Sequence, residues 1–308
     1  VGVASQDRVA FLDKNGIEHF EVFFGASLLN AVCVDVNWRL AAPEIEYIVN
    51  DAQAKVLVVG PDFVAVLDAI AANLTTVTRI LVIGGHEGHE SYEDWVASFP
   101  ADDPGAESQS GDVAFQLYSS GTTGRPKGVM LSNDNFFSLL PLAKEMWELT
   151  HDSVNLIAMP LFHIGGGGWA VAGMYEGCTS VIFRELDPAA LIRTIEEERI
   201  THAFLVPAVL QFMLMVPGVA DADYSSLRVL VYGASPISED VLARCVEMFA
   251  PCKFWQAYGL TETTGAVVTL APEDHDPAGP NRHRLRPCGL PGPGVELRIV
   301  GDDDRACN

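Results

Sequence analysis

The chain has 308 residues, of which 49% are hydrophobic and 19% are charged. This length and composition are typical of two folded domains or one large α/β domain, and they exclude a disordered or low-complexity protein. Asp and Glu number 41 against 19 Lys and Arg, which gives a formal net charge of −22. Because such a negative field repels nucleic acids and anionic membranes, we expect neither as a partner.

The location of the protein is indicated by the apolar runs and the cysteines. No apolar stretch reaches the roughly 18 residues that a membrane span needs. The first residues, VGVASQD, have no starting Met and none of the features of a signal peptide. The six cysteines form no C-x-x-C pair, which favours reduced thiols over disulfides or a zinc site. We therefore expect a cytoplasmic protein without a transmembrane segment.

Short β-branched runs alternate with helical segments along most of the chain. Strands are predicted at residues 55–59, 79–83, 113–118, 179–183, 228–232, 253–257 and 295–300. Most of them are continuous apolar runs, which are typical of strands covered on both faces. Helices are predicted at residues 43–54, 189–199 and 238–248, where proline or N-capping residues mark the first turn. This alternation predicts an α/β fold with largely parallel sheets.

Two segments interrupt the alternation. Residues 84–111 are rich in Gly, His, Ser and acidic side chains, and we predict a surface loop or a connection between subdomains. Residues 271–293 are dense in Pro and Gly and contain Arg282, Arg284 and Arg286. They predict a long irregular excursion before the strand at residues 295–300.

A loop rich in glycine and hydroxyl groups, with the sequence YSSGTTGRPKG at residues 118–128, follows a predicted strand. Glycine lets backbone N–H groups approach an anion, hydroxyls donate hydrogen bonds, and Arg125 and Lys127 neutralise charge. The segment is not a Walker A loop, because Gly128 stands where Ser or Thr would bind magnesium. A flexible linker is the alternative, but linkers seldom lie between two apolar strands. We therefore interpret the segment as a phosphate-binding loop.

Three further motifs follow in order. They read PLFHIGG at residues 160–166, YGASP at residues 232–236 and QAYGLTET at residues 256–263. With these four motifs the chain resembles the adenylate-forming family, which includes acyl-CoA synthetases, aryl-acid ligases, luciferases and peptide-synthetase adenylation domains. The resemblance extends more weakly over residues 7–299. It implies an α/β fold with the layered αβαβα large domain of that family and mostly parallel sheets.

The resemblance also implies a reaction in two halves. A carboxylate attacks the α-phosphate of ATP, pyrophosphate leaves, and a thiol, usually that of coenzyme A, then displaces AMP from the acyl adenylate. Such chemistry depends on alignment and charge neutralisation more than on a protein nucleophile. The implied cofactors and partners are ATP, Mg²⁺, coenzyme A and a small-molecule carboxylic acid, and a homo-oligomer stays open.

By the resemblance, individual positions acquire roles. The catalytic positions are Lys127, Thr261 and Glu262. The metal-binding positions are Thr122 and Glu262, and Thr261 also faces the α-phosphate. The nucleotide-binding positions are Ser119, Ser120, Gly121, Thr122, Thr123, Gly124, Lys127, Gly233, Ala234, Ser235, Gln256, Ala257, Tyr258, Gly259 and Thr261. The substrate-binding positions are His163, Trp169, Val206, Gly233 and Thr263.

The acid that is activated is indicated by His163. Amino-acid-activating relatives place an Asp after the Phe of this motif, where it pairs with the α-ammonium group, whereas here His163 follows Phe162. An amino-acid substrate is therefore disfavoured, whether His163 gates the site or only satisfies a core hydrogen bond. We expect apolar pocket walls, which suit a fatty acid first and an aryl acid as the alternative, although such residues also form ordinary core. The expected walls are Trp169, residues 204–207, Phe212, Met213 and Met215.

The resemblance ends at Asn308. In the family, a ribose-binding Asp, a hinge and a small C-terminal domain with a catalytic Lys come later, and helices precede residues 7–10. We interpret residues 1–308 as an incomplete AMP-binding large domain without the C-terminal lid domain. We divide it into about 1–110 (part of the first sheet subdomain), 111–270 (nucleotide and acyl site) and 271–308 (start of the following β subdomain).

Three functions are left open by this interpretation. An acyl-CoA ligase domain that binds ATP or an acyl adenylate but turns over poorly alone is the first. A nucleotide-binding or acyl-adenylate-binding fragment without catalysis is the second. A regulatory or assembly subunit that kept the fold and lost the ligands is the third.

Overall fold

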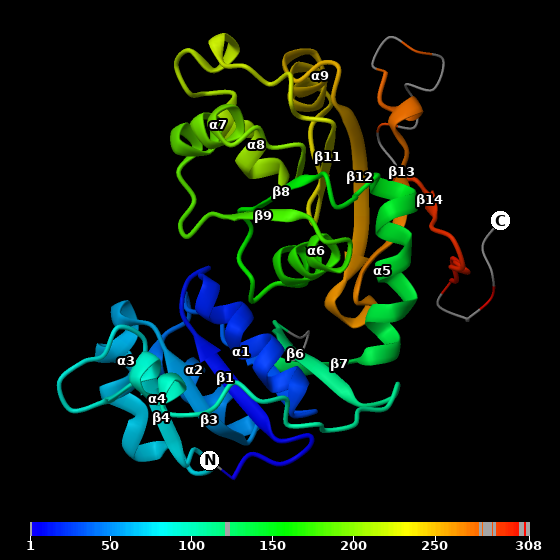
Figure 1. Ribbon diagram of the computed structural model, residues 1–308. Helices are drawn as coiled ribbons and strands as arrows, with labels where there is room; N and C mark the ends of the chain where they lie inside the picture. Colours follow the sequence, from blue (N-terminus) through cyan, green and yellow to red (C-terminus); the bar gives the residue numbers. More distant parts are fainter. Residues whose placement is uncertain are drawn as a thin grey trace.

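The computed structural model describes residues 2–120, 124–276, 279, 285, 288–301 and 305. Within them the chain forms two seven-stranded sheets, one from residues before 133 and one from residues after 153 (Figure 1). Most neighbouring strands are parallel, and the antiparallel pairs lie at one edge of each sheet. The predicted α/β fold with mostly parallel sheets is confirmed.

The first sheet has the strand order β5-β4-β3-β1-β2-β6-β7. Its strands are β1 (Arg8–Leu12), β2 (Val32–Asp35), β3 (Ala54–Val59), β4 (Arg79–Val82), β5 (Glu90–Ser91), β6 (Val113–Ser119) and β7 (Lys127–Ser132). Only β6 and β7 are antiparallel to each other. Because they belong to this sheet, the first sheet extends to residue 132, later than the division expected near residue 110.

The second sheet has the strand order β14-β13-β12-β11-β10-β8-β9. Its strands are β8 (Val154–Ile157), β9 (Thr179–Ile182), β10 (His202–Leu205), β11 (Val229–Gly233), β12 (Lys253–Leu260), β13 (Gly265–Leu270) and β14 (Leu290–Pro291). The strands from β9 to β12 are parallel, while β13 and β14 are antiparallel additions. This places the carboxyl ends of β11 and β12 side by side.

Helices connect the strands. They are α1 (Ile17–Leu28), α2 (Ala42–Asp51), α3 (Val64–Ile70), α4 (Tyr92–Ala97), α5 (Asn133–Trp147), α6 (Ile164–Tyr175), α7 (Pro188–Glu197), α8 (Pro207–Met213) and α9 (Glu239–Met248). The predicted caps are confirmed at α7 and α9, where Asp187 accepts a hydrogen bond from the Ala190 N–H and Ser238 from the Val241 N–H. The three predicted helices and the six strands predicted before residue 258 end within three residues of their expected bounds.

The continuous apolar runs are explained by the two faces of the first sheet. Along β1, Val9 and Phe11 pack into the cluster that contains α1, whereas Ala10 and Leu12 pack into the one that contains α2 and α3. Successive side chains of a strand point to opposite faces, so a strand covered on both faces needs apolar residues throughout.

The two halves of the chain are joined by a buried polar contact just after β1. The Asn15 side chain donates hydrogen bonds to the carbonyl oxygens of Met159 and Phe183, and it accepts one from the Leu161 N–H. Next to it, the guanidinium of Arg184 donates to both carboxylate oxygens of Asp13, at 3.0 and 3.1 Å. These contacts fix the first sheet against the segments that lead into α6 and follow β9.

Two predictions at the irregular segments need correction. Residues 84–111 are not loop throughout, because β5 and α4 form there and the Ser91 hydroxyl caps α4 at the Asp94 N–H. Residues 295–299 do not form the predicted strand, and only an isolated bridge occurs at Val300. The excursion is described only in part: Arg282, Arg284 and Arg286 lie outside the described residues.

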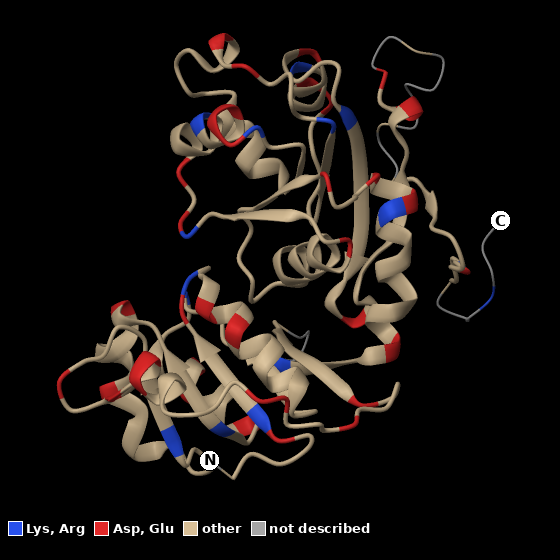
Figure 2. Cartoon of the chain, in the orientation of Figure 1, with Lys and Arg blue, Asp and Glu red and all other residues tan. Residues whose placement is uncertain are grey.

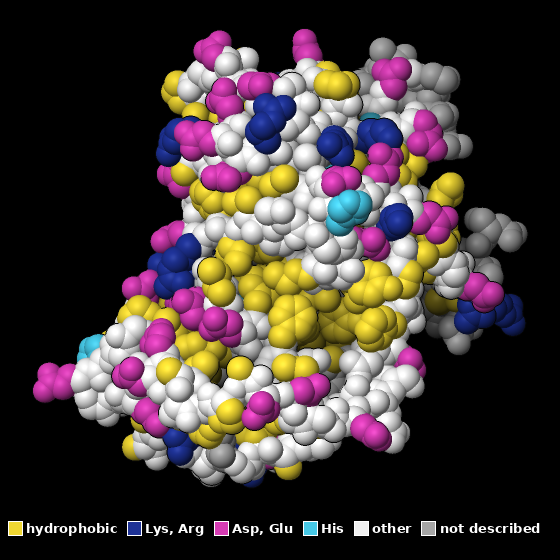
Figure 3. Space-filling model, in the orientation of Figure 1, with side chains coloured by type: hydrophobic (Ala, Val, Ile, Leu, Met, Phe, Trp, Pro, Cys, Tyr) yellow, Lys and Arg dark blue, Asp and Glu magenta, His cyan; other side chains and the backbone are white. Residues whose placement is uncertain are grey.

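The surface reflects the composition. Acidic side chains are spread over both halves of the chain, and Lys and Arg are sparse (Figure 2). The described cysteines are free thiols, as expected. Among the described residues no helix combines the length and apolar character needed to cross a membrane. Hydrophobic side chains gather between the two sheets (Figure 3), and exposed ones of α1, α5 and α6 include Ile17, Phe24, Leu28, Phe137 and Tyr175.

Candidate active site

The predicted phosphate-binding loop connects β6 and β7. These strands form an antiparallel hairpin in which Ser119 pairs with Lys127, so both ends of the loop are held at the edge of the first sheet. Ser120, Gly124 and Lys127 are exposed, and Gly124 has a positive φ of 88°, which glycine adopts without strain. The predicted residues Gly121, Thr122 and Thr123 lie outside the described residues.

The loop meets the last motif across the cleft between the sheets. The Ser119 hydroxyl donates a hydrogen bond to Oε1 of Glu262 at 3.1 Å, although the two residues are 143 positions apart. Glu262 is exposed and lies in a short 3₁₀ turn, Thr261–Thr263, that follows β12. The structure therefore brings a hydroxyl of the first motif to the carboxylate of the last.

The turn that carries Glu262 is stabilised by Thr263. Its hydroxyl accepts from the Leu260 N–H at 2.9 Å and lies within hydrogen-bond distance of the carbonyl oxygens of Leu260 and Gly265. These contacts with the backbone indicate that the Thr263 hydroxyl stabilises the turn. By contrast, the Thr261 hydroxyl has no hydrogen-bond partner within the described part of the chain, so it is free to meet a ligand.

The motifs at residues 232–236 and 256–259 come together because β11 and β12 are parallel neighbours. Gly233 pairs with Ala257, and a Cβ atom on Gly233 would overlap the Ala257 carbonyl oxygen. Only glycine permits this approach. Ala234 then turns the chain with a positive φ of 66°, which strains a residue with a side chain and is typical of functional sites. Ser235 and Tyr258 are exposed at this edge.

An apolar cavity begins at this edge and runs between α5 and α6. Its empty volume is about 1030 Å³, part of which is open to solvent. From the motifs, Ala234, Ala257 and Gly259 line it. The helical and sheet walls are Phe136, Leu139, Leu140, Leu142, Ala143, Met146 and Trp147 of α5, Ile164, Gly165, Gly168, Trp169 and Ala172 of α6, and Phe204 and Val231 of the sheet. The remaining lining residues are Thr264, Gly265, Ala266, Gly292, Pro293 and Val295.

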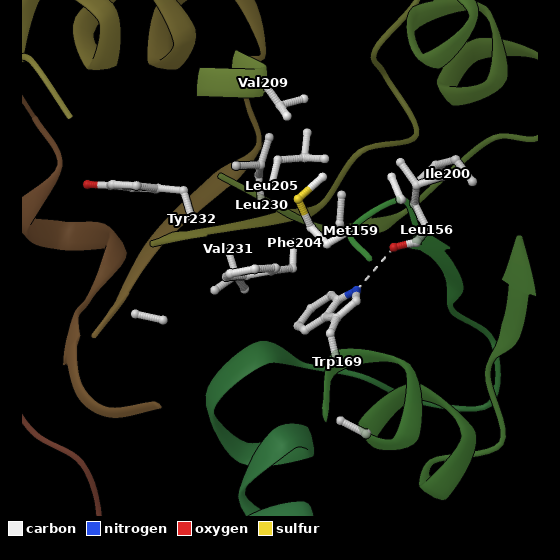
Figure 4. Packing of buried hydrophobic residues seen from close by; sticks show 14 of the residues in the cluster. Leu156, Met159, Trp169, Ile200, Phe204, Leu205, Val209, Leu230, Val231 and Tyr232 are labelled. Carbon is white, nitrogen blue, oxygen red and sulfur yellow. Dashed lines mark hydrogen bonds between the residues drawn. The ribbon is translucent and has the colours of Figure 1, made fainter. Parts of the chain in front are cut away.

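The deep wall of this cavity is aromatic. Trp169 rises from α6 toward the strands, where its indole N–H donates to the Leu156 carbonyl at 3.2 Å, and Phe204 lies beside it (Figure 4). The ring centroids of Trp169 are 6.3 Å from Phe204 and 5.4 Å from Trp147. The hydrogen bond fixes the Trp169 ring, so this wall is formed before any ligand arrives.

His163 precedes α6 as its N-cap residue. Its ring packs on Phe162 with centroids 4.4 Å apart, and the guanidinium of Arg39 lies 5.8 Å from the Phe162 ring. Part of His163 reaches solvent. Desolvation of the rest, followed by the positive charge of Arg39, lowers the pKa of His163, so the neutral imidazole is the form present at pH 7.

Some predicted substrate residues lie elsewhere. Trp169 and Phe204 line the cavity, but Val206 does not, and Thr263 supports a turn. The residues expected as a wall on α8 and just after it do not line this cavity: Phe212 and Met215 are exposed, and Met213 is buried in the core.

The wall that sequence reasoning missed is α5. Seven of its residues line the cavity, yet this helix was not among those predicted. The available signal was the Ser132 cap with Asn135 three residues later, which forms a capping box in the structure.

Comparison with known proteins agrees with this architecture. The family described as AMP-binding enzyme matches residues 1–307. The chain is 37% identical over 99% of its length to a fatty acid–[acyl-carrier-protein] ligase, ScoC, of Streptomyces coeruleorubidus, and 34% identical over 98% to an indoleacetate–CoA ligase of Aromatoleum aromaticum. It spans 57% and 58% of the lengths of these two proteins.

A solved structure has the same fold. The inhibitor-bound N-terminal domain of FACL13 from Mycobacterium tuberculosis superimposes with a TM-score of 0.88 at 31% identity. The match covers 99% of this chain and 74% of that one. The two sheets, the hairpin loop that reaches Glu262 and the match over residues 1–307 lead to one conclusion: this chain belongs to the AMP-binding enzyme family, whose members similar to it are acyl-CoA and acyl-carrier-protein ligases.

Proposed function

We propose that this chain carries the site at which a hydrophobic carboxylic acid and ATP form an acyl adenylate, the first half of an acyl-CoA ligase reaction. The observation that carries the proposal is the meeting of three features where the two sheets come together at the Ser119–Glu262 contact. They are the hairpin loop with Lys127, the Ser119–Glu262 hydrogen bond, and an apolar cavity that opens beside Ala234 and Gly259. A polar anion-binding end joined to an apolar tunnel matches the two ends of an acyl adenylate.

Each group of residues would bind a different part of the nucleotide. Lys127 and the exposed hydroxyl of Ser120 would bind the phosphates that leave, and the free hydroxyl of Thr261 would donate to the α-phosphate. The backbone around Gly233 and Ala234, with Gln256 to Tyr258 on the neighbouring strand, would bind the adenine. These groups align the carboxylate with the phosphorus and neutralise charge, and no protein nucleophile is needed.

Magnesium fits the acidic end of the site. The Glu262 carboxylate and the Ser119 hydroxyl are hard oxygen donors placed 3.1 Å apart, which is the ligand type that Mg²⁺ prefers. In a protein with a net charge of −22, a bound tetra-anion needs such a cation. When bound, the ion would neutralise phosphate charge. Glu262 would hold it, and Ser119 would orient the carboxylate.

The substrate would be a fatty acid or an aryl acid. The leucines and Met146 of α5 favour a flexible chain, and the relative ScoC is a fatty-acid ligase by name. An aryl acid is the second candidate, because Phe136, Trp147, Trp169 and Phe204 give the cavity an aromatic wall and aromatic pairs attract beyond their buried area. Neutral His163 in place of an anion disfavours an amino acid.

ATP binding tests the nucleotide end of the proposal. Lys127→Ala removes a charge-assisted contact of about 1.5–3 kcal/mol, so calorimetry should show the affinity for MgATP falling about ten- to hundredfold. Arg193→Ala is the matched control, since it removes one positive charge from an exposed site on α7. Equal affinities in the two variants would show that Lys127 does not contact the nucleotide.

Acyl-adenylate binding tests the two ends together. A non-hydrolysable decanoyl-adenylate analogue should bind more tightly than AMP, because only the analogue fills the apolar cavity. If neither ligand binds this chain, the adenylate site is not formed and the proposed function is wrong.

A further inference from the structure

Four consecutive glycines, Gly165 to Gly168, form the first turns of α6. Glycine is a poor helix former, so their presence needs a structural reason. At Gly166 a Cβ atom would overlap the Pro160 carbonyl, and at Gly167 it would lie 2.8 Å from the Leu161 carbonyl. Close packing against the preceding backbone therefore requires these two glycines.

Gly168 has no such requirement. A Cβ atom there would meet only the end of the Ile164 side chain, at 3.2 Å, and it would touch no backbone of the segments around the helix. Gly168 nevertheless lines the apolar cavity. Gly165 also lines it, but its Cβ would lie 2.8 Å from the Phe204 ring. Of the four glycines, Gly168 is the one whose missing side chain leaves space for a ligand and serves no packing contact.

The position of Gly168 along the cavity follows from helix geometry. Ile164, Gly168 and Ala172 are spaced one turn apart on α6, and all three line the cavity. At 1.5 Å per residue they span roughly 12 Å, with Gly168 halfway. Ile164 lies at the end near the motifs, since a Cβ atom on Gly265 would be 3.9 Å from it. Ala172, one turn past Gly168, lines the other end of this row.

We propose that Gly168 is the residue that sets the length of the acyl group accepted, by keeping the passage open between the motif end of the cavity and the end lined by Ala172. This inference rests on the proposed function. It assigns the substrate class as acids whose acyl group passes Gly168 and reaches the turn of α6 that carries Ala172. A side chain at this position would narrow the cavity between Ile164 and Ala172.

The test is a titration of the chain with acyl-adenylate analogues of increasing acyl length, from acetyl to hexadecanoyl, followed by calorimetry. In the unmodified chain, each methylene that passes Gly168 and is buried in the cavity should tighten binding about fourfold. In Gly168→Leu, with each affinity referred to that of the acetyl analogue in the same variant, the affinity should stop rising at a shorter acyl length. Gly168→Ala should give an intermediate limit.

Two controls separate the inference from folding and from the proposed function. Gly25→Leu changes an exposed helical glycine of α1 with open space around it, and it should leave the length dependence unchanged. Gly168→Ala should melt no lower than the unmodified chain, because alanine favours the helix. The same length limit in the unmodified and Gly168 variants overturns this inference and leaves the proposed function standing. Failure of the acetyl analogue and AMP to bind the unmodified chain overturns both.

Discussion

Thr261 and Thr263 lie two residues apart in one turn, and their hydroxyls have different surroundings. Thr263 contacts the backbone of Leu260 and Gly265, whereas the Thr261 hydroxyl has no partner within the described residues. Thr263→Val should therefore lower the free energy of unfolding by about 1–3 kcal/mol, because a backbone N–H loses its acceptor. Thr261→Val should leave stability within about 0.5 kcal/mol.

Urea denaturation and adenylate formation together check this pair. Thr261→Val should slow adenylate formation while MgATP affinity stays close to that of the unmodified chain, since in the proposed site the hydroxyl would contact the α-phosphate only. If the two variants lose equal stability, Thr261 is a structural residue and its proposed role is wrong. The sequence alone assigns both threonines to the site, because a motif does not show which hydroxyl the backbone uses.

His202 makes stability depend on pH. It is fully buried on β10, its Nδ1 lies 2.8 Å from the Thr201 hydroxyl, and desolvation, with a smaller contribution from Arg228, lowers its pKa to about 4. The unfolded chain has the ordinary value near 6.5 and binds the proton first as the pH falls. Stability is therefore unaffected by His202 above pH 6.5 and is lost between pH 6.5 and 4.

Unfolding in urea at pH 7.0 and 4.5 measures this effect. His202 should account for about 2 kcal/mol of the loss between the two values. His202→Gln should shrink the difference by that amount, whatever its own stability at pH 7.0. His151→Gln is the control, because the His151 side chain is 80% exposed and should leave the difference unchanged. An undiminished loss in His202→Gln would assign the acid sensitivity to other groups.

At the scale of elements, α6 forms against its own sequence preference. Its glycines are tolerated because the helix must lie against the residues that precede it, and a Cβ atom on Gly166 would overlap the Pro160 carbonyl. Gly166→Ala should therefore destabilise the chain by more than about 1 kcal/mol, although alanine is the better helix former. Gly25→Ala, in the exposed middle of α1, should stabilise it by about 0.5–1 kcal/mol.

Thermal unfolding checks both variants. The melting temperature of Gly166→Ala should fall, and that of Gly25→Ala should rise. A rise in both melting temperatures would mean that the backbone of residues 160–166 shifts at little cost to accommodate a methyl group. The comparison with Gly168→Ala is direct, because that variant adds the same methyl group to the same helix without the overlap.

The difference between sequence preference and tertiary packing explains which elements could be predicted. The buried strands at residues 55–59 and 229–233 appear in the sequence as apolar runs, and parallel strands covered on both faces need such runs. The helix at residues 164–175 was not predicted, because tertiary packing and not propensity holds a glycine-rich helix. Residues 295–299 were wrongly predicted as a strand, since alternating apolar residues alone do not provide a neighbour for pairing.

The candidate site divides in a similar way. The meeting of the first and last motifs could be predicted because the motifs stand in a recognisable order, and the structure shows it as the Ser119–Glu262 hydrogen bond. Their role toward a nucleotide stays a prediction. The apolar end could not be predicted, because any large hydrophobic side chain serves as a wall. The choice of α5 over α8 is made by how helices pack, and no motif encodes it.

At the scale of the whole molecule, a desolvated charge is one of the contacts that join the two sheets. The Asp13 side chain is 1% exposed and follows β1, and Arg184, which follows β9, binds both of its oxygens. Gly60 packs directly against the Asp13 carboxylate, and a Cβ atom on Gly60 would overlap it. Removing the guanidinium would leave a buried carboxylate without its counter-charge, which typically costs several kcal/mol.

Arg184→Met should therefore lower the free energy of unfolding by about 2–4 kcal/mol, toward the lower end because the Arg184 side chain is 45% exposed. Lys14→Met is the matched control. Lys14 pairs with Asp62 and Glu185 at 3.1 Å each, but these partners are 52% and 69% exposed, so its loss should stay within about 1 kcal/mol. Urea denaturation at pH 7 separates the two. Equal losses of unfolding free energy in the two variants would mean that water reaches Asp13 once the arginine is gone. Asn15, with its three backbone contacts, would then be the main contact that stabilises the junction between the sheets.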